Sequence, residues 1–111
     1  MELTIITDQL WEELIKMDRS DFKVKIKDFA IPNKYIDRMI MEVDKRGLSI
    51  LGGDILEIVN GNLIHTYDNW YSDIKDQENQ EDYRIRTYTD ALNFLRNYKF
   101  RENNFIVFVL K

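Results

Sequence analysis

The sequence has 111 residues, of which 44% are hydrophobic and 32% charged, and its formal net charge is −4. This length is near the commonest size of a single domain, so we expect one domain over residues 1–111. A mean hydropathy of −0.45, with no long apolar run, argues against an integral membrane protein, and a pI near 5.0 argues against nucleic acid or an anionic membrane as the main partner.

Cysteine is absent from the sequence. Disulfides, thiol catalysis and cysteine-ligated zinc are therefore excluded. Residues 1–8 lack the basic stretch, the apolar core and the cleavage site of a secretory signal. Together these features favour a reducing, cytoplasmic setting.

The first predicted element is a helix that starts behind two capping candidates, Thr7 and Asp8, and ends between Asp18 and Ser20. Its apolar residues recur at helical spacing: Leu10, Trp11, Leu14 and Ile15. The next segment, from Phe22 to Lys27, alternates apolar residues with lysines. Such alternation is typical of a half-buried strand whose lysines discourage pairing at its edge, although a loop is an equally good interpretation.

A second helix is predicted to open at Pro32-Asn33 and to stop at Gly47. Its apolar residues lie at positions i, i+3, i+4 and i+7: Ile36, Met39, Ile40 and Val43. The basic pair Lys45-Arg46 suits the last turn of a helix, where the helix dipole favours positive charge.

Two apolar runs, Leu48 to Leu51 and Ile55 to Val59, are separated by the pair Gly52-Gly53. We expect one strand with a bulge or bend at these glycines, where side chains do not fit and at least one glycine adopts a conformation closed to other residues. Asn60-Gly61 then predicts a two-residue type I′ turn into a second strand, Asn62 to Asp68, because this turn needs positive φ at both central positions.

A two-residue turn also sets which residues lie opposite one another in this hairpin. Val59 is expected opposite Asn62, and Leu56 opposite His65. Side chains alternate between the two faces of a strand, so one face carries Ile55, Glu57, Val59, Ile64 and Thr66. The other is the predicted core face, with Leu56, Ile58, Leu63, His65 and Tyr67.

The polar stretch from Asp73 to Asp82 leads into a third predicted helix that ends near Asn97. Its inward residues are expected to be Ile85, Tyr88, Ala91, Leu92 and Leu95. Phe105 to Leu110 is apolar at every position, which predicts a central strand covered on both faces. The predicted fold class is α+β: a small, mostly antiparallel sheet, built from the Asn-Gly hairpin and the C-terminal strand, packed with about three helices.

Candidate catalytic groups are few. His65 is the only histidine, no triad motif surrounds it, and its predicted apolar neighbours favour a packed structural role. The acids Asp54, Glu57, Asp68 and Asp73 could ligate a cation, but their spacing matches no known cation-binding loop. We therefore expect no catalytic residue, no metal and no cofactor. The alternative is a small metal- or His-dependent hydrolase or nuclease that uses His65 with Asp54 or Asp68.

Glycines can also mark a phosphate-binding loop. Gly52-Gly53 is not followed by the Lys-Ser/Thr pair of such loops, and it joins strand to strand. The structural interpretation, a bulge, is favoured for this pair.

Two features indicate protein binding instead. The aromatic residues Tyr67, Trp70 and Tyr71 cluster at the end of the hairpin, and tyrosine and tryptophan are common at the centres of protein interfaces. A core role is favoured for Trp70, and the two roles are balanced for Tyr71. The second feature is charge: the decade from Asp73 to Asp82 has five acids and one base, so it carries the whole net charge of −4. Its last acids suit a helix N-terminus, and the decade as a whole could attract a basic partner.

The segment from Gly47 to Asp54, followed by the hairpin and by Tyr67-Asp68-Asn69-Trp70-Tyr71, resembles the immunity protein 40 family of bacterial polymorphic toxin systems. The resemblance implies a cytoplasmic, non-enzymatic antitoxin that binds and blocks the toxin domain of its own strain or of sister cells. An acidic protein of this kind would suit a basic, nuclease-like toxin. A generic adaptor domain is a further alternative, and the oligomeric state stays open.

This interpretation defines two sets of residues. The structural motif comprises Gly52, Gly53, Asp54, Asn60 and Gly61. The residues expected to bind the partner are Asp68, Asn69, Trp70, Tyr71, Asp73, Asp76 and Glu78.

Overall fold

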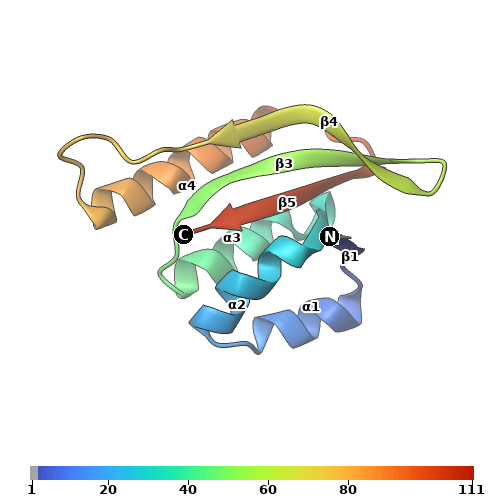
Figure 1. The fold of residues 1–111 in the computed structure, drawn as a ribbon, viewed down its shortest axis with the longest axis horizontal. Helices are drawn as coiled ribbons and strands as arrows, with labels where there is room; N and C mark the ends of the chain where they lie inside the picture. The colour runs from blue at the N-terminus through green and yellow to red at the C-terminus, as the bar shows by residue number, and fades with distance from the viewer. Residues whose placement is uncertain (1–2) are drawn as a thin grey trace.

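A five-stranded sheet, in the order β1-β2-β5-β3-β4, forms the centre of the structure. The computed structural model describes residues 3–111. Strand β1 (Thr4–Ile5) runs parallel to β2 (Phe29–Pro32), and every other neighbouring pair is antiparallel. The helices pack on one face of this sheet around a single large core (Figure 1). The α+β class with a mostly antiparallel sheet is therefore confirmed.

The first two helices begin at side-chain caps. Helix α1 (Asp8–Ile15) begins behind Thr7, whose hydroxyl accepts a hydrogen bond from the backbone of Leu10. Helix α2 (Arg19–Lys25) begins behind Asp18, whose carboxylate accepts from the backbone of Asp21, and a 3-10 helix (Ile26–Asp28) follows it.

The prediction of a strand or loop from Phe22 to Lys27 is wrong. Phe22 and Ile26 are fully buried, whereas Val24 is 62% exposed. The apolar period that matters is therefore four residues, one helical turn, rather than two. Asp18 supplies the helix start, and the lysines lie on the exposed side of the helix.

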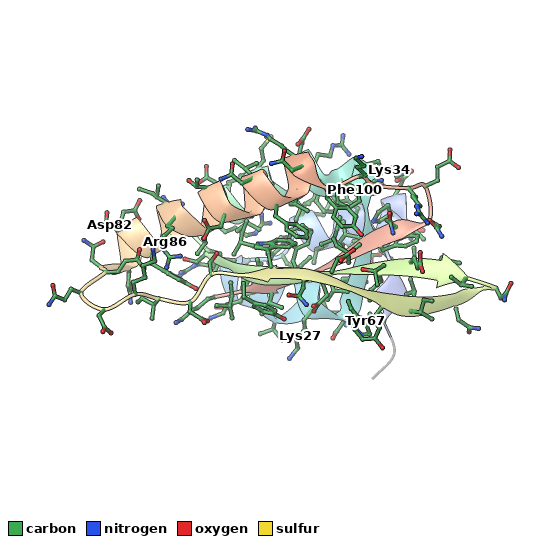
Figure 2. All side chains as sticks on the ribbon, turned by 90° about the horizontal axis from the view of Figure 1, so that it is seen from above. Lys27, Lys34, Tyr67, Asp82, Arg86 and Phe100 are labelled. Atoms are coloured by element: carbon green, nitrogen blue, oxygen red, sulfur yellow. The ribbon has the colours of Figure 1, made fainter. Side chains whose placement is uncertain are left out.

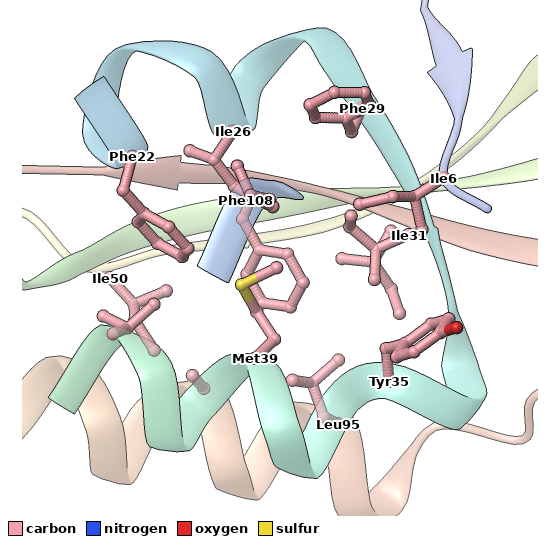
Figure 3. Close-up of a cluster of buried hydrophobic side chains, with 14 of the residues drawn as sticks. Ile6, Phe22, Ile26, Phe29, Ile31, Tyr35, Met39, Ile50, Leu95 and Phe108 are labelled. Atoms are coloured by element: carbon pink, nitrogen blue, oxygen red, sulfur yellow. The ribbon is translucent and has the colours of Figure 1, made fainter. Parts of the chain in front are cut away.

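The second predicted helix is confirmed as α3 (Ile36–Lys45), preceded by a 3-10 helix (Asn33–Tyr35) that starts at Pro32. The chain leaves it through Gly47, whose φ of 67° is a conformation that glycine adopts without strain. Met39 points into the core, where it meets residues of the other helices and of the sheet (Figure 3). Val43 is buried in the same core.

The predicted hairpin is confirmed. Strand β3 (Ile50–Val59) and strand β4 (Asn62–Tyr71) are joined by Asn60 and Gly61, with φ of 52° and 81°. Val59 pairs with Asn62 and Leu56 with His65, as expected. Strand β4 continues beyond the predicted end at Asp68, as far as Tyr71.

The predicted core face of the hairpin is wrong. The main core contains Ile55, whereas Leu56 belongs to a smaller cluster with Ala30 and Phe105 on the other face of the sheet. His65 is exposed and Tyr67 is 88% exposed. Both faces of β3 carry apolar residues, so the alternation alone could not show which face the helices cover.

Strand β5 (Asn104–Leu110) is central, as predicted, and lies between β2 and β3. Its Ile106 and Phe108 are fully buried under the helices. On its other face, Val107 and Val109 are only half-buried. The expectation of full cover on both faces is therefore correct for one face alone.

Helix α4 (Gln80–Asn97) confirms the third predicted helix, with Asn79 as its cap. The prediction that Ile85 points inward is wrong, since this side chain is 53% exposed. The buried face contains Thr87, whose hydroxyl accepts a hydrogen bond from the backbone of Ile50 on β3. Because its hydrogen bond satisfies the hydroxyl, Thr87 can be buried. Hydrophobicity alone therefore predicts a different buried face for α4 from the one observed. Among residues 3–111, no helix has both the length and the hydrophobicity needed to cross a bilayer.

Candidate functional site

The two motifs singled out in the sequence lie side by side in the sheet. Gly52 pairs with Tyr71, Gly53 with Trp70, and Asp54 with Asn69. Because side chains alternate along each strand, these pairs point in turn to opposite faces of the sheet. The candidate residues are therefore divided between the face that the helices cover and the face that they leave open.

Trp70 and Asp68 lie on the helix side. The Trp70 ring stacks on Phe94 of α4, with ring centroids 4.9 Å apart, and is 8% exposed. A Cβ on Gly53 would lie 2.6 Å from Cζ3 of this ring. Any residue other than glycine at position 53 would therefore clash with the indole. The Asp68 carboxylate accepts a hydrogen bond of 2.7 Å from the hydroxyl of Tyr98. Trp70 thus connects β4 to α4, and Asp68 connects β4 to the residue that follows α4.

Tyr71 and Asn69 lie on the open side. The Tyr71 ring covers Gly52, where an added Cβ would be 2.6 Å from Cδ1 of the ring. Burial raises the pKa of the Tyr71 hydroxyl, and the charge and hydrogen bond of the neighbouring Asp54 carboxylate raise it further. Tyr71 is nevertheless 54% exposed. A glycine on each face thus allows an aromatic ring to lie flat across the sheet.

Tyr67 lies at an irregularity in the hairpin. Between the pairs Asp54–Asn69 and Leu56–His65, strand β3 has one residue, whereas β4 has three, Thr66 to Asp68. Tyr67, in the middle, has a φ of 69° and is 88% exposed. A side chain in this left-handed region costs roughly 1–2 kcal/mol. Figure 2 shows Tyr67 on the side of the sheet away from α4.

The bulge is held by its own hydrogen bonds. The Thr66 hydroxyl donates to the backbone oxygen of Ile55 at 2.8 Å and accepts from the backbone amide of Asp68 at 3.1 Å. The Tyr98 bond to Asp68 fixes the other side of the bulge. Tyr67 is therefore presented from a defined backbone and not from a loose loop.

We define the open face as the side of β3, β4 and β5 that the helices leave uncovered. Within these three strands, all of which the structure describes, Asp54 is the one carboxylate that the pairing places on this face. It forms no ion pair with any residue in the range 3–111. The other residues of the open face are uncharged or apolar: Gly52, Leu56, Ile58, Leu63, His65, Tyr67, Asn69, Tyr71, Phe105, Val107 and Val109.

The acidic decade lies in the loop before α4 and in its first turn, at one end of the molecule (Figure 2). Glu78 forms an ion pair of 2.8 Å with Arg86, and these hydrogen bonds lower the pKa of Glu78 to about 2. Glu81 pairs with Arg84 at 2.8 Å. Much of the predicted negative charge is thus balanced by α4, and Asp73 and Asp76 keep carboxylates without an ion pair within the described residues.

The groups of the alternative enzyme interpretation are only partly together. His65 and Asp68 line the same shallow pocket of about 290 Å³, together with Tyr98, Lys99 and Arg101. Asp54 does not line this pocket. No group of three or more His, Cys, Asp or Glu side chains suited to a metal occurs among residues 3–111.

The α+β fold covers one face of its sheet with helices and leaves tyrosines exposed on the other. The family model of immunity protein 40 matches residues 20–110, and the chain belongs to that family. No curated protein and no solved structure matches the chain.

One exposed residue of this site was missed from the sequence. Tyr67 was expected on the core face, because a regular hairpin places it two residues beyond His65 on the side of Leu56. Only a slip of two residues in β4 brings Trp70 opposite Gly53 and Tyr71 opposite Gly52. The complementarity of two glycines and two large rings on facing strands is the signal that could have indicated this slip.

Proposed function

We propose that this chain is an immunity protein that binds a cognate toxin domain and neutralises it by contact, without catalysis of its own. The observation that carries the proposal is the open face, on which Tyr67 and Tyr71 are exposed in a chain of the immunity protein 40 family. Aromatic side chains with a polar tip contribute large apolar area to protein interfaces at little cost in conformational entropy.

Charge supports the same role. The net charge of −4, with Asp54 on the open face and Asp73 and Asp76 in the loop before α4, favours a basic partner. A toxin that binds nucleic acid presents such a surface, because it must attract phosphates. One acidic domain acting in the cytoplasm, where a toxin of this type would find its target, fits the cysteine-free sequence.

The direct test uses the gene next to that of this chain. If it encodes a large protein, its C-terminal domain is expressed with and without this chain, and cell survival and binding of the purified proteins are measured. We expect survival only with this chain and a stable complex of the two domains. Absence of both rescue and binding would refute the proposal.

The enzyme alternative has its own test. The purified protein is incubated with RNA, DNA and generic ester substrates in the presence of Mg²⁺, Mn²⁺ or Zn²⁺. We expect no turnover. Metal-dependent turnover that His65→Ala abolishes would favour a hydrolase or nuclease over an immunity protein.

A further inference from the structure

Resting on the proposed function, we infer that Tyr67 is the anchor of the toxin interface, that its ring enters a recess on the toxin, and that Asp54 receives a basic side chain of the toxin next to this recess. The inference follows from three observations: the backbone at Tyr67, its exposure, and the charge of the open face.

The backbone at Tyr67 is unfavourable for tyrosine. Elsewhere in residues 3–111, φ is positive at Gly47 and Gly61, at Asn60 in the turn, and at Gln77 in the loop before α4. Asparagine tolerates this region far better than an aromatic residue does. At Tyr67, with a φ of 69°, glycine would satisfy the backbone without strain. A bulky residue at such a position indicates a function that the side chain itself performs.

Hydrogen bonds of Thr66 and Tyr98 hold the backbone of the bulge, but the Tyr67 side chain itself adds little within the described structure to offset this strain. The Tyr67 side chain is 88% exposed, and its one aromatic neighbour is His65, with ring centroids 6.3 Å apart. The bulge does interrupt the edge of β4 and so discourages pairing with other strands. That purpose needs an irregular backbone but no tyrosine. The remaining role for the ring is contact with another molecule.

The charge of Asp54 indicates that the partner presents a basic side chain. This half-buried carboxylate has Tyr71 as its neighbour and no ion pair among residues 3–111. An Arg or Lys of the partner would compensate its charge and could pack against the exposed tyrosine rings. A second copy of this chain is a poorer fit, because its net charge is also −4 and its own open face carries Asp54 but no Lys or Arg in β3, β4 or β5. The occupant is therefore a toxin domain with a basic rim around an apolar recess.

The experiment uses the full chain and the C-terminal toxin domain encoded by the adjacent gene. Dissociation constants and thermal midpoints are measured for Tyr67→Ala, Tyr67→Gly and the control Met41→Ala, which truncates a side chain on α3 that is 70% exposed. Both Tyr67 variants should bind at least about 30-fold more weakly, which is about 2 kcal/mol. Met41→Ala should bind like the wild type.

The thermal midpoints separate an anchor from a folding residue. Alanine keeps the strained backbone and glycine relieves it, so Tyr67→Gly should unfold about 2–4 °C above Tyr67→Ala. Neither should unfold well below the wild type, because the ring has few internal contacts. Loss of binding in proportion to loss of stability would overturn the inference.

Asp54 is tested in the same complex. Asp54→Asn keeps the size of the side chain and removes its charge, and it should weaken binding about tenfold or more, chiefly through faster dissociation. The control is Asp37→Asn on α3, which should bind like the wild type. Equal affinity of Asp54→Asn and the wild type would overturn the assigned chemistry.

The outcomes distinguish this inference from the proposed function. Wild-type protein that fails to bind the toxin overturns both. Wild-type binding that the Tyr67 variants retain overturns the inference and leaves the immunity function intact. A dimer of the protein alone that Tyr67→Ala dissociates would show that a second copy covers the open face, and would also overturn it.

Discussion

Gly53 and Trp70 lie opposite each other on β3 and β4, and the indole ring occupies the space in which a side chain at position 53 would begin. The same relationship joins Gly52 and Tyr71 on the other face. A side chain at position 53 is therefore excluded by the Trp70 ring, and one at position 52 by the backbone oxygen of Trp70 as well as by the Tyr71 ring. Neither glycine has a positive φ. The expectation of a glycine conformation closed to other residues is wrong at this pair, whereas the expectation that side chains do not fit is confirmed.

The first prediction concerns this fit. Gly53→Ala should lower the free energy of unfolding in urea by about 1–3 kcal/mol, because the added methyl group displaces the Trp70 ring from its place on Phe94. A double-mutant cycle with Trp70→Leu supplies the control, since the smaller side chain should remove most of the extra cost. Strictly additive effects would show that the ring and the glycine are not coupled.

The second prediction separates the two faces of β4. Tyr71→Ala should leave the unfolding midpoint nearly unchanged and should weaken toxin binding by about 2 kcal/mol, because its ring is exposed on the open face. Trp70→Ala should instead lower the free energy of unfolding by about 3–5 kcal/mol, because it empties the core between β4 and α4. Equal loss of stability in the two variants would mean that Tyr71 is also a core residue.

The third prediction concerns the loop before α4. Asp73 and Asp76 form no ion pair within the described residues, so neutralising both to Asn should slow association with a basic toxin at low salt. The difference should shrink at physiological ionic strength, where screening acts over about 8 Å. Glu78 is left unchanged because it pairs with Arg86. Stopped-flow association across a salt series is the measurement, and identical rates for both proteins would refute steering by this loop.

The fourth prediction is a pH dependence. Hydrogen bonds from Arg86 lower the pKa of Glu78 from 4.5 to about 2 in the folded protein. The stabilisation by this pair is therefore complete above the unfolded pKa and is lost as the pH falls through about 2. The gap in thermal midpoint between the wild type and Glu78→Gln should be widest above about pH 5 and should close towards pH 2.

The control for this prediction is Glu12→Gln on α1, which removes a carboxylate that forms no ion pair within the described residues. Its midpoint should follow the wild type throughout the titration. A gap for Glu78→Gln that stays constant from pH 7 to pH 2 would contradict the assigned pairing.

Local signals were enough to predict the elements that are bounded by characteristic turn or helix-terminating residues. Asn60-Gly61 predicted both the turn and the pairing of Leu56 with His65, because that turn type permits one register. Pro32, Gly47 and the apolar period between them predicted α3 for the same reason. In each case the deciding interactions lie within a few residues of one another.

The errors arise where contacts between residues far apart in the sequence determine the structure. Phe22 to Ile26 is compatible with several structures, and the main core selects the helix, since Phe22 and Ile26 both pack there. The left-handed backbone at Tyr67 depends on the pairing of Gly52 and Gly53 with the end of β4, and its exposure depends on which face the helices cover. No local pattern specifies either. Residues at the candidate site are the least predictable from sequence, because their backbone departs from local preference.

The order of strands also bears on how this protein is made. Ile31 of β2 pairs with Ile106 of β5, and β5 lies between β2 and β3. The sheet therefore cannot form completely while β5 is still inside the ribosome. Until then the apolar faces of the N-terminal elements remain exposed. Half-made chains would offer no finished surface to a toxin. Under the proposed function, completed chains stored in advance would protect a cell with continuous exposure to the toxin, whereas chains still in synthesis would not.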